Sequence, residues 1–193
     1  MAIRIALVRH GHASAGWDTA IDPDLDDLGR SQAETVAHQL DLKFVDLNII
    51  ATRVEIVTSP LLRCQQTAAA FARRRHVVPR VCSEVAEIPS PNGVVMSARI
   101  DWLRGAMQGT WADLGSNYVS FRNSTVEFVR AINSDTAIFS HFIAITAVIG
   151  AITGDDRLVI RRLDNCSVTS VERDSSGQLH IVEEGHEADT LIR

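Results

Sequence analysis

Hydrophobic and polar positions follow two patterns that alternate along the chain. Short apolar runs of strand length occur at 3–8, 56–58 and 136–139, and another short strand is expected at 77–82. Between them lie longer stretches in which apolar residues recur every three or four positions, as they do on the buried face of a helix. Strands that alternate with helices predict an α/β fold with a mostly parallel central sheet, covered by helices on both faces.

Helices are predicted wherever the longer pattern occurs. The first spans about 27–40, and either Asp26 or Asp27 can cap it. Ser59 followed by Pro60 predicts the start of the next helix, with serine as the cap and proline in the first helical position. The remaining predictions are the end of that helix near 75, helices at 97–107, 118–132 and 142–152, an irregular segment at 41–55, and an edge hairpin of strands at 168–173 and 179–183.

One segment departs from this alternation. Residues 83–117 are rich in turn-forming residues and contain Trp102 and Trp111. We interpret the segment as a cap inserted above the sheet of a single domain, 1–193, where it would wall a ligand site and set its specificity. The two tryptophans are expected to serve packing, because aromatic side chains dominate protein cores.

Composition narrows the class of protein. The net charge of −5 over 193 residues gives no general attraction to nucleic acid or anionic lipid. The longest apolar run, 142–152, is too short for a membrane span, which needs about 20 residues. Cys64, Cys82 and Cys166 show neither a metal-binding spacing nor a disulfide framework, and the first strand begins without a signal peptide. We therefore expect a cytoplasmic protein with free thiols and with neither nucleic acid nor a membrane as partner.

Reactive and cationic side chains follow three of the predicted strands. Arg9 and His10 end the first strand, Ser59 leads from the second to Arg63, and His141 follows the strand at 136–139. The carboxyl ends of parallel strands meet at one edge of a sheet, where ligands of open α/β folds bind. The topology therefore predicts that these side chains converge.

Such a cluster suits chemistry on a phosphoryl group. Two arginines can hold its oxygens by bidentate hydrogen bonds, and their charge lowers the pKa of His10. Neutral His10 could then attack phosphorus and form a phosphohistidine, while His141 donates to the phosphoryl oxygens. The leaving group needs a proton from a carboxylic acid, for which Glu84 and Glu87 are the local candidates.

A metal site is the alternative interpretation of the same residues. His10, His12 and His141, together with an aspartate from 22–27, could ligate zinc. The two nearby arginines would oppose a dication, so the sequence favours the phosphoryl site.

Six segments, in this order along nearly the whole chain, resemble the histidine phosphatase superfamily, which has the phosphoglycerate mutase-like fold. The most specific are the Arg-His-Gly triplet and the segment that contains Arg63. The six segments are Val8 to Gly11, Leu28 to Ala33, Ser59 to Ala68, Glu84 to Glu87, Ser140-His141 and Asp164 to Val168.

The resemblance implies a three-layer α/β/α domain and a phosphatase of the histidine acid phosphatase type. It implies that His10 is the phosphorylated nucleophile and that Arg9, Arg63 and His141 form the phosphate pocket. Glu87 best matches the family's proton donor. The resemblance implies neither a metal nor an organic cofactor.

The chain also departs from the family pattern. In the first loop only Ser14 could add a side chain to the phosphate pocket, and Phe142 replaces the usual small residue after the second histidine. The run 88–91 replaces the glycine, tryptophan and glutamate typical of mutases, which favours a phosphatase over a mutase. The substrate stays open between a phosphorylated small molecule and a phosphoprotein, such as one carrying phosphohistidine. A catalytically idle phospho-binding protein on the same fold is the third hypothesis.

Overall fold

A mixed sheet forms the centre of the molecule. The computed structural model describes residues 2–16, 18–44 and 54–188. Within them, six strands pair in the order β3-β2-β4-β1-β5-β6, with β1 to β4 parallel and the β5–β6 hairpin antiparallel at the edge. The strands are β1 (Ile3–Arg9), β2 (Glu55–Thr58), β3 (Arg80–Val81), β4 (Thr136–Ser140), β5 (Val168–Arg173) and β6 (Leu179–Glu183). The predicted α/β class and the edge hairpin are confirmed.

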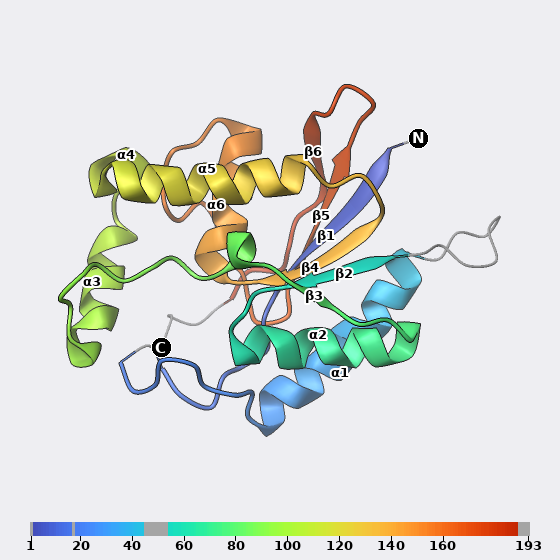
Figure 1. Cartoon of the computed structure of the whole chain (residues 1–193), viewed down its shortest axis with the longest axis horizontal. Coiled ribbons are helices and arrows are strands. Elements are labelled where there is room, and N and C mark those ends of the chain that lie inside the picture. Colours follow the sequence, from blue (N-terminus) through green and yellow to red (C-terminus); the bar gives the residue numbers. More distant parts are fainter. Residues whose placement is uncertain (1, 17, 45–53, 189–193) are drawn as a thin grey trace.

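Helices cover both faces of this sheet, as Figure 1 shows. On one face α1 (Asp27–Lys43) packs beside α2 (Leu62–Arg75), and on the other α5 (Ser116–Arg130) packs against α6 (Phe142–Thr153). This arrangement is the three-layer α/β/α sandwich that the resemblance implies. Among the described residues, no helix is long and apolar enough to cross a membrane.

Alternate residues of the strands face the two layers of the core. Ile5 and Leu7 of β1 pack with α5 and α6, whereas Ala6 and Val8 pack with α1 and α2. All four side chains are buried, as is the whole of β4. A parallel strand between two helical layers is apolar on both sides, which explains the continuous apolar runs in the sequence.

Residues 83–117 contain short helical elements in place of a regular layer. They are the 3₁₀ turns η1 (Ser83–Val85) and η2 (Met96–Ala98), α3 (Arg99–Ala106) and α4 (Trp111–Leu114). Trp111 is fully buried and stacks on Phe121 with ring centroids 6.1 Å apart, and Trp102 lies 5.8 Å from the ring of Tyr118. Packing is therefore the role of both tryptophans in this structure.

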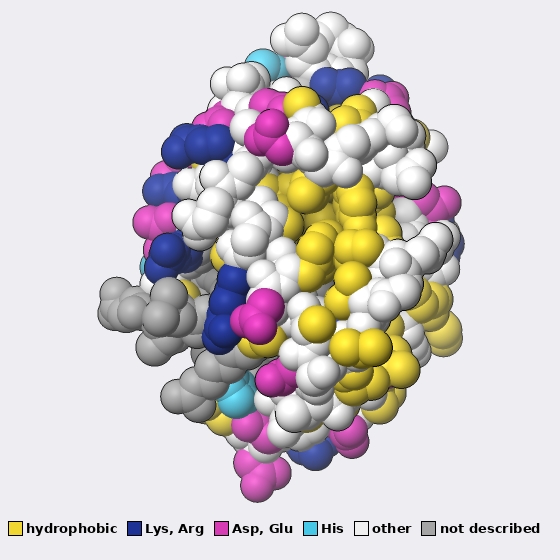
Figure 2. All heavy atoms as spheres, turned by 90° about the vertical axis from the view of Figure 1, so that its left-hand side faces the viewer, with side chains coloured by type: hydrophobic (Ala, Val, Ile, Leu, Met, Phe, Trp, Pro, Cys, Tyr) yellow, Lys and Arg dark blue, Asp and Glu magenta, His cyan; other side chains and the backbone are white. Residues whose placement is uncertain are grey.

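The side of the molecule that carries α3 and α4 has a partly apolar surface. Figure 2 shows hydrophobic side chains gathered in a hollow there, with charged side chains at its margins. Trp102, Met107, Leu114 and Tyr118 are only partly buried against the core. The segment that we interpreted as a cap thus leaves some of its apolar side chains uncovered.

Two predicted elements differ from the structure. The strand expected at 77–82 contracts to β3, because Pro79 has no N–H for a ladder and β3 lies at the edge of the sheet. The irregular segment expected at 41–55 begins later than predicted, since α1 continues to Lys43. Its part at 45–53 lies outside the described residues.

The start of α2 also differs from its prediction. The helix begins at Leu62, and Leu61 is its N-cap residue without a side-chain cap. The Ser59 Oγ accepts from the Leu61 N–H at 3.2 Å and also lies 2.7 Å from His141 Nε2, across the sheet edge. The serine thus has a long-range partner in addition to a local one, and the helix begins later than the Ser-Pro pattern predicts.

Two glycines allow the loop after β1 to pack directly on the first turn of α1. A Cβ atom at Gly29 would lie 2.1 Å from the carbonyl oxygen of His12, and one at Gly11 would lie 2.6 Å from the carbonyl oxygen of Gly29. Asp26 fixes the same turn, because its side chain accepts a hydrogen bond from the Gly29 N–H at 2.8 Å. The backbone beside His10 therefore has no room for a side chain.

We expect Gly29→Ala to lower the free energy of unfolding by about 1–3 kcal/mol, the usual cost of overpacking. Gly105→Ala is the matched control, because Gly105 also lies in a helix but has no atom within 4 Å of the place that a methyl group would occupy. The control should be neutral or stabilising by up to about 1 kcal/mol, since alanine is the better helix former. Urea unfolding measures both, and equal effects would contradict the close approach.

Candidate active site

The register of the parallel strands brings the three strand ends together. Arg9 of β1 lies opposite Ser140 of β4, and the His10 N–H donates to the Ser140 carbonyl at 3.0 Å. The Ser59 N–H donates to the Phe139 carbonyl at 2.9 Å. Side chains that follow β1, β2 and β4 therefore leave the sheet at the same edge.

Helix α2 brings the arginine to this edge. Arg63 is the second residue of the helix and is 4% exposed. Thr67, one turn later, accepts a hydrogen bond from the Gly11 N–H at 3.0 Å and donates to the Arg63 carbonyl at 2.7 Å. This buried threonine links the loop after His10 to the helix that carries Arg63.

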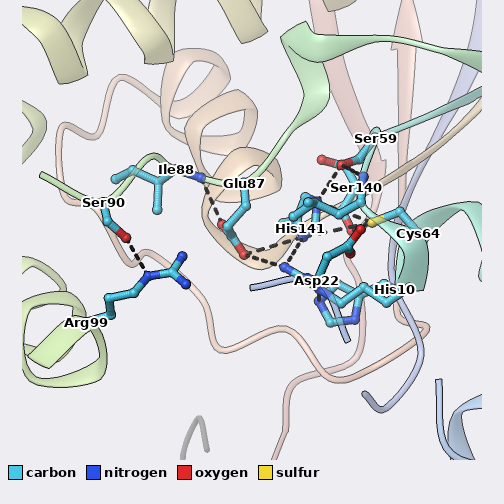
Figure 3. Close-up of polar contacts among 12 residues, drawn as sticks. His10, Asp22, Ser59, Cys64, Glu87, Ile88, Ser90, Arg99, Ser140 and His141 are labelled. Carbon is cyan, nitrogen blue, oxygen red and sulfur yellow. Dashed lines mark hydrogen bonds and ion pairs between the residues drawn. The ribbon is translucent and has the colours of Figure 1, made fainter. Parts of the chain in front are cut away.

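The Arg63 guanidinium contacts the two histidines (Figure 3 shows the surrounding network). Its Nε donates to His10 Nε2 at 3.1 Å, and its Nη2 lies 3.1 Å from His141 Nδ1. The centroids of the two imidazole rings are 5.3 Å apart. The predicted convergence of these three residues is present in the structure.

The hydrogen bonds of His10 define which of its nitrogens carries the proton. His10 Nδ1 lies 2.7 Å from the Gly11 carbonyl oxygen, which can only accept, so Nδ1 carries the hydrogen. The lone pair is then on Nε2, which accepts from Arg63. This is the tautomer that a nucleophile at Nε2 requires.

Burial and neighbouring cations keep both histidines neutral. Burial lowers the pKa of His10 well below its usual value, and the charges of Arg63 and Arg9 lower it further. The pKa of His141 is lowered well below its usual value by the same causes, burial first and then Arg63. Protonating either ring would place a second buried cation beside the guanidinium.

Glu87 is the carboxyl group that the structure brings to this cluster. Its Oε2 lies 3.4 Å from His141 Nδ1 and 3.8 Å from Arg63 Nη2, and its Oε1 accepts from the Ile88 N–H at 3.1 Å. Burial raises the pKa of Glu87 although the charge of Arg63 opposes this. Glu84, the other candidate, is exposed, and its carboxylate accepts from the hydroxyl of Ser83.

Arg9 lies beside the cluster and is held by Leu163 and Phe142. Its Nη1 donates to the Leu163 carbonyl at 2.5 Å, and its guanidinium carbon lies 5.6 Å from the centroid of the Phe142 ring. The unusual Phe142 therefore stacks under Arg9, in addition to any narrowing of the pocket. A buried Arg9 Nε has no partner within the described part of the chain, which leaves a donor for an anion.

Ser14 and His12 of the first loop have their contacts outside the cluster. Ser14 is exposed, and its N–H donates to the Asp24 carbonyl at 2.8 Å. His12 Nδ1 lies 2.7 Å from a carboxylate oxygen of Asp26. Nor do the described residues contain a group of three or more histidines, cysteines or acids placed to hold a metal, so the alternative zinc site is not found.

Four neighbours of the cluster were not assigned a role in the predicted phosphoryl site. Ser59 Oγ lies 2.7 Å from His141 Nε2, and Cys64 Sγ lies 3.3 Å from the same nitrogen. Ser59 directly follows β2, so the strand-end rule that finds the histidines applies to it too. Arg99 is the third neighbour: it donates to Ser90 Oγ at 2.8 Å, and its charge lowers the pKa of Glu87. Asp22 is the fourth, as Figure 3 shows.

Asp22 occupies part of the N-terminus of α2. A helix N-terminus offers free N–H groups that can bind an anion. In the structure Asp22 Oδ1 already accepts from the Leu62 N–H at 2.7 Å, so part of that N-terminus is occupied by the chain's own carboxylate. Side chains, rather than this N–H, are left to bind a phosphoryl group.

The low pKa of His10 predicts how stability changes with pH. Below about pH 6.5 the unfolded chain binds a proton at this residue and the folded protein does not, so stability falls as the pH falls. Relative to His10→Gln, wild type should lose about 1 kcal/mol of unfolding free energy between pH 7 and pH 5.5. Urea unfolding at both pH values measures it. His38→Gln, which removes an exposed imidazole from α1, is the control, and identical pH dependence of wild type and His10→Gln would contradict a neutral buried His10.

Solved structures with the same fold are similar over almost the whole chain. A mycobacterial hydrolase is 20% identical with a TM-score of 0.73, covering 97% of this chain and 100% of its own. Mycobacterial glucosyl-3-phosphoglycerate phosphatase is 19% identical with a TM-score of 0.72, covering 94% and 98%. Phosphoserine phosphatase from Entamoeba histolytica, in complex with 3-phosphoglyceric acid, is 18% identical with a TM-score of 0.72, covering 97% and 98%.

A family model extends the comparison from fold to family. A comparison with curated proteins gave no match. The model described as the histidine phosphatase superfamily (branch 1), however, matches residues 5–183. This match indicates a phosphatase or a phosphotransferase as the class of activity. The chain belongs to the histidine phosphatase superfamily.

Proposed function

We propose that this protein is a metal-independent phosphomonoesterase that works through a phosphohistidine on His10. The observation that carries the proposal is that Arg63 donates to unprotonated nitrogens of both His10 and His141. One buried cation thus lies between two neutral imidazoles, with a carboxyl group 3.4 Å from the second ring. When a substrate binds, its phosphoryl oxygens could take the place of the imidazole nitrogens and accept from the same Arg63 N–H groups.

In the first step His10 Nε2 attacks phosphorus in line with the ester oxygen. The N–P bond forms as the P–O bond to the leaving group breaks. Arg9, Arg63 and His141 hold the three non-bridging oxygens, whose charge they stabilise in the transition state. The buried Arg9 Nε supports this assignment, because it has an unused hydrogen for an acceptor.

Glu87 supplies the proton that the leaving oxygen needs. Its raised pKa favours the protonated form that a general acid requires. In the second step the Glu87 carboxylate takes a proton from water as that water attacks phosphorus. The N–P bond breaks, inorganic phosphate leaves, and His10 and Glu87 return to their starting states.

A phosphorylated small molecule is the substrate class that we favour. Two proteins with the same fold are named for such substrates, glucosyl-3-phosphoglycerate and phosphoserine. The segment 83–117 supports the choice, since it carries Glu87 and places the cation of Arg99 within electrostatic reach of it. The thiols of Cys64, Cys82 and Cys166 are free, which supports a reducing compartment such as the cytoplasm.

The direct test is hydrolysis of an aryl phosphate with EDTA present, followed by trapping of acid-labile phosphate on the protein. We expect wild type to turn over and to carry the label, and His10→Ala to do neither. His12→Ala is the matched control, because this neighbouring histidine pairs with Asp26 outside the cluster. Wild type that binds vanadate without turnover would identify an idle phospho-binding protein, and a panel with phosphopeptides would reveal a phosphoprotein phosphatase.

Glu87→Gln tests the proton donor. Glutamine keeps the size of the side chain but cannot transfer a proton, so we expect kcat on alkyl phosphates to fall by about 10²–10⁴-fold. Aryl phosphates with a good leaving group need little protonation and should lose far less in the first step. Glu84→Gln is the control at the exposed carboxylate nearby. Equal losses on both classes of ester would count against Glu87 as the acid.

A further inference from the structure

The partners of His141 define its tautomer in the free protein. Arg63 Nη2 lies 3.1 Å from Nδ1, and a guanidinium can only donate, so Nδ1 carries the lone pair. The ring hydrogen is then on Nε2, which donates to Ser59 Oγ at 2.7 Å. His141 is fully buried and neutral, so the ring has one hydrogen and not two.

A bound phosphoryl group requires the opposite tautomer. Nδ1 is the nitrogen that faces Arg63 and Glu87, and therefore the proposed phosphate pocket. Phosphoryl oxygens accept hydrogen bonds, so Nδ1 must carry the hydrogen when it contacts them. Nε2 is then a buried acceptor, and a buried acceptor without a donor destabilises that state.

Ser59 is the group that can satisfy Nε2 in both states. It is fully buried, and its N–H is fixed to the Phe139 carbonyl at 2.9 Å. Its Oγ accepts from the Leu61 N–H at 3.2 Å, so the hydroxyl hydrogen is available to another acceptor. A hydroxyl can rotate between accepting and donating, whereas a carbonyl could only accept.

The second contact of Nε2 is a poorer donor. Cys64 Sγ lies 3.3 Å from Nε2 but also 3.4 Å from the Ser140 carbonyl, to which its S–H can donate. A thiol is a weak donor compared with a hydroxyl. Ser59 is therefore the stronger of the two partners of this nitrogen.

We propose that Ser59 is a positioning residue that lets His141 change tautomer when a phosphoryl group binds. The hydroxyl accepts from Nε2–H in the free protein and donates to Nε2 in the complex. Both states contain one ring hydrogen and one hydroxyl hydrogen. The ring hydrogen moves from Nε2 to Nδ1 by exchange with solvent, and the hydroxyl hydrogen rotates onto Nε2. This inference rests on the phosphate pocket of the proposed function.

The test is the tautomer of His141 in ¹⁵N-histidine-labelled protein, read from two-bond ¹H–¹⁵N spectra with and without vanadate. In wild type we expect the hydrogen to be on Nε2 without vanadate and on Nδ1 with it. Ser59→Ala should keep the Nε2–H form in both samples, bind vanadate about tenfold or more weakly, and lose a similar factor in kcat. Ser59→Thr, which retains a hydroxyl, should restore the change of tautomer.

Ser140→Ala is the matched control. Ser140 is as buried as Ser59 and precedes His141 directly, but its hydroxyl donates to the Val85 carbonyl at 2.7 Å instead of contacting the ring. This variant should retain the vanadate-dependent tautomer change even where it lowers stability. Loss of the change in Ser140→Ala as well would show a general effect of packing and would overturn the role of Ser59.

Two other results would also overturn the inference. One is a wild-type His141 that stays Nε2–H with vanadate bound, and the other is a Ser59→Ala protein that changes tautomer as wild type does. Either result could accompany normal turnover, which would leave the phosphatase proposal intact. Conversely, the protein could show a tautomer change that depends on Ser59 but no turnover. This result would support the inference about Ser59 and contradict the proposal that the protein is a phosphatase.

Discussion

The site depends on a buried cation whose hydrogen-bond acceptors are neutral rings. Arg63 has almost no exposure to water, and its guanidinium donates to His10 and His141. Imidazole nitrogens can accept hydrogen bonds only while they are unprotonated. Burial destabilises the Arg63 cation, and it also lowers the pKa of both histidines and so keeps their rings neutral. The charge and the neutral rings therefore maintain each other. The carboxyl group of Glu87 lies nearby, 3.8 Å from Arg63 Nη2, without a direct hydrogen bond to it.

Rigid parts of the fold hold this arrangement in place. His10 and His141 follow two neighbouring parallel strands, and α6, which begins immediately after His141, is buried from Phe142 to Gly150. Thr67 joins α2 to the loop after β1. Only Glu87 comes from an irregular segment, after the 3₁₀ turn η1. The two histidines and Arg63 thus belong to the core, whereas Glu87 belongs to a part of the chain with less regular structure.

Much of this could be predicted from the sequence, because buried parallel strands leave continuous apolar runs and their ends meet at one edge. His10, Arg63 and His141 were found on that basis. Hydrogen bonds that a side chain makes outside its local pattern could not be predicted. Ser59 follows the local pattern of a helix cap, yet its hydroxyl contacts His141, 82 residues away. Asp22 likewise accepts a hydrogen bond from the N–H of Leu62 in α2, which is 40 residues further along the chain. Spacing also could not separate Glu84 from Glu87, since the direction of each side chain depends on the turn that carries it.

Within the segment between Glu87 and α5, the stretch around Gly93 and Val95 is packed less firmly than the parts on either side of it. Ile88 is 2% exposed, and Trp111 is buried and joined by its N–H to the Asp156 carbonyl. Between them, Val95 is exposed, and Gly93 has no neighbouring atom within 4 Å of its Cβ position. Lengthening a loop whose ends are already fixed costs little free energy. The stretch around Gly93 and Val95 can therefore change in length and sequence while Glu87 and the core keep their places.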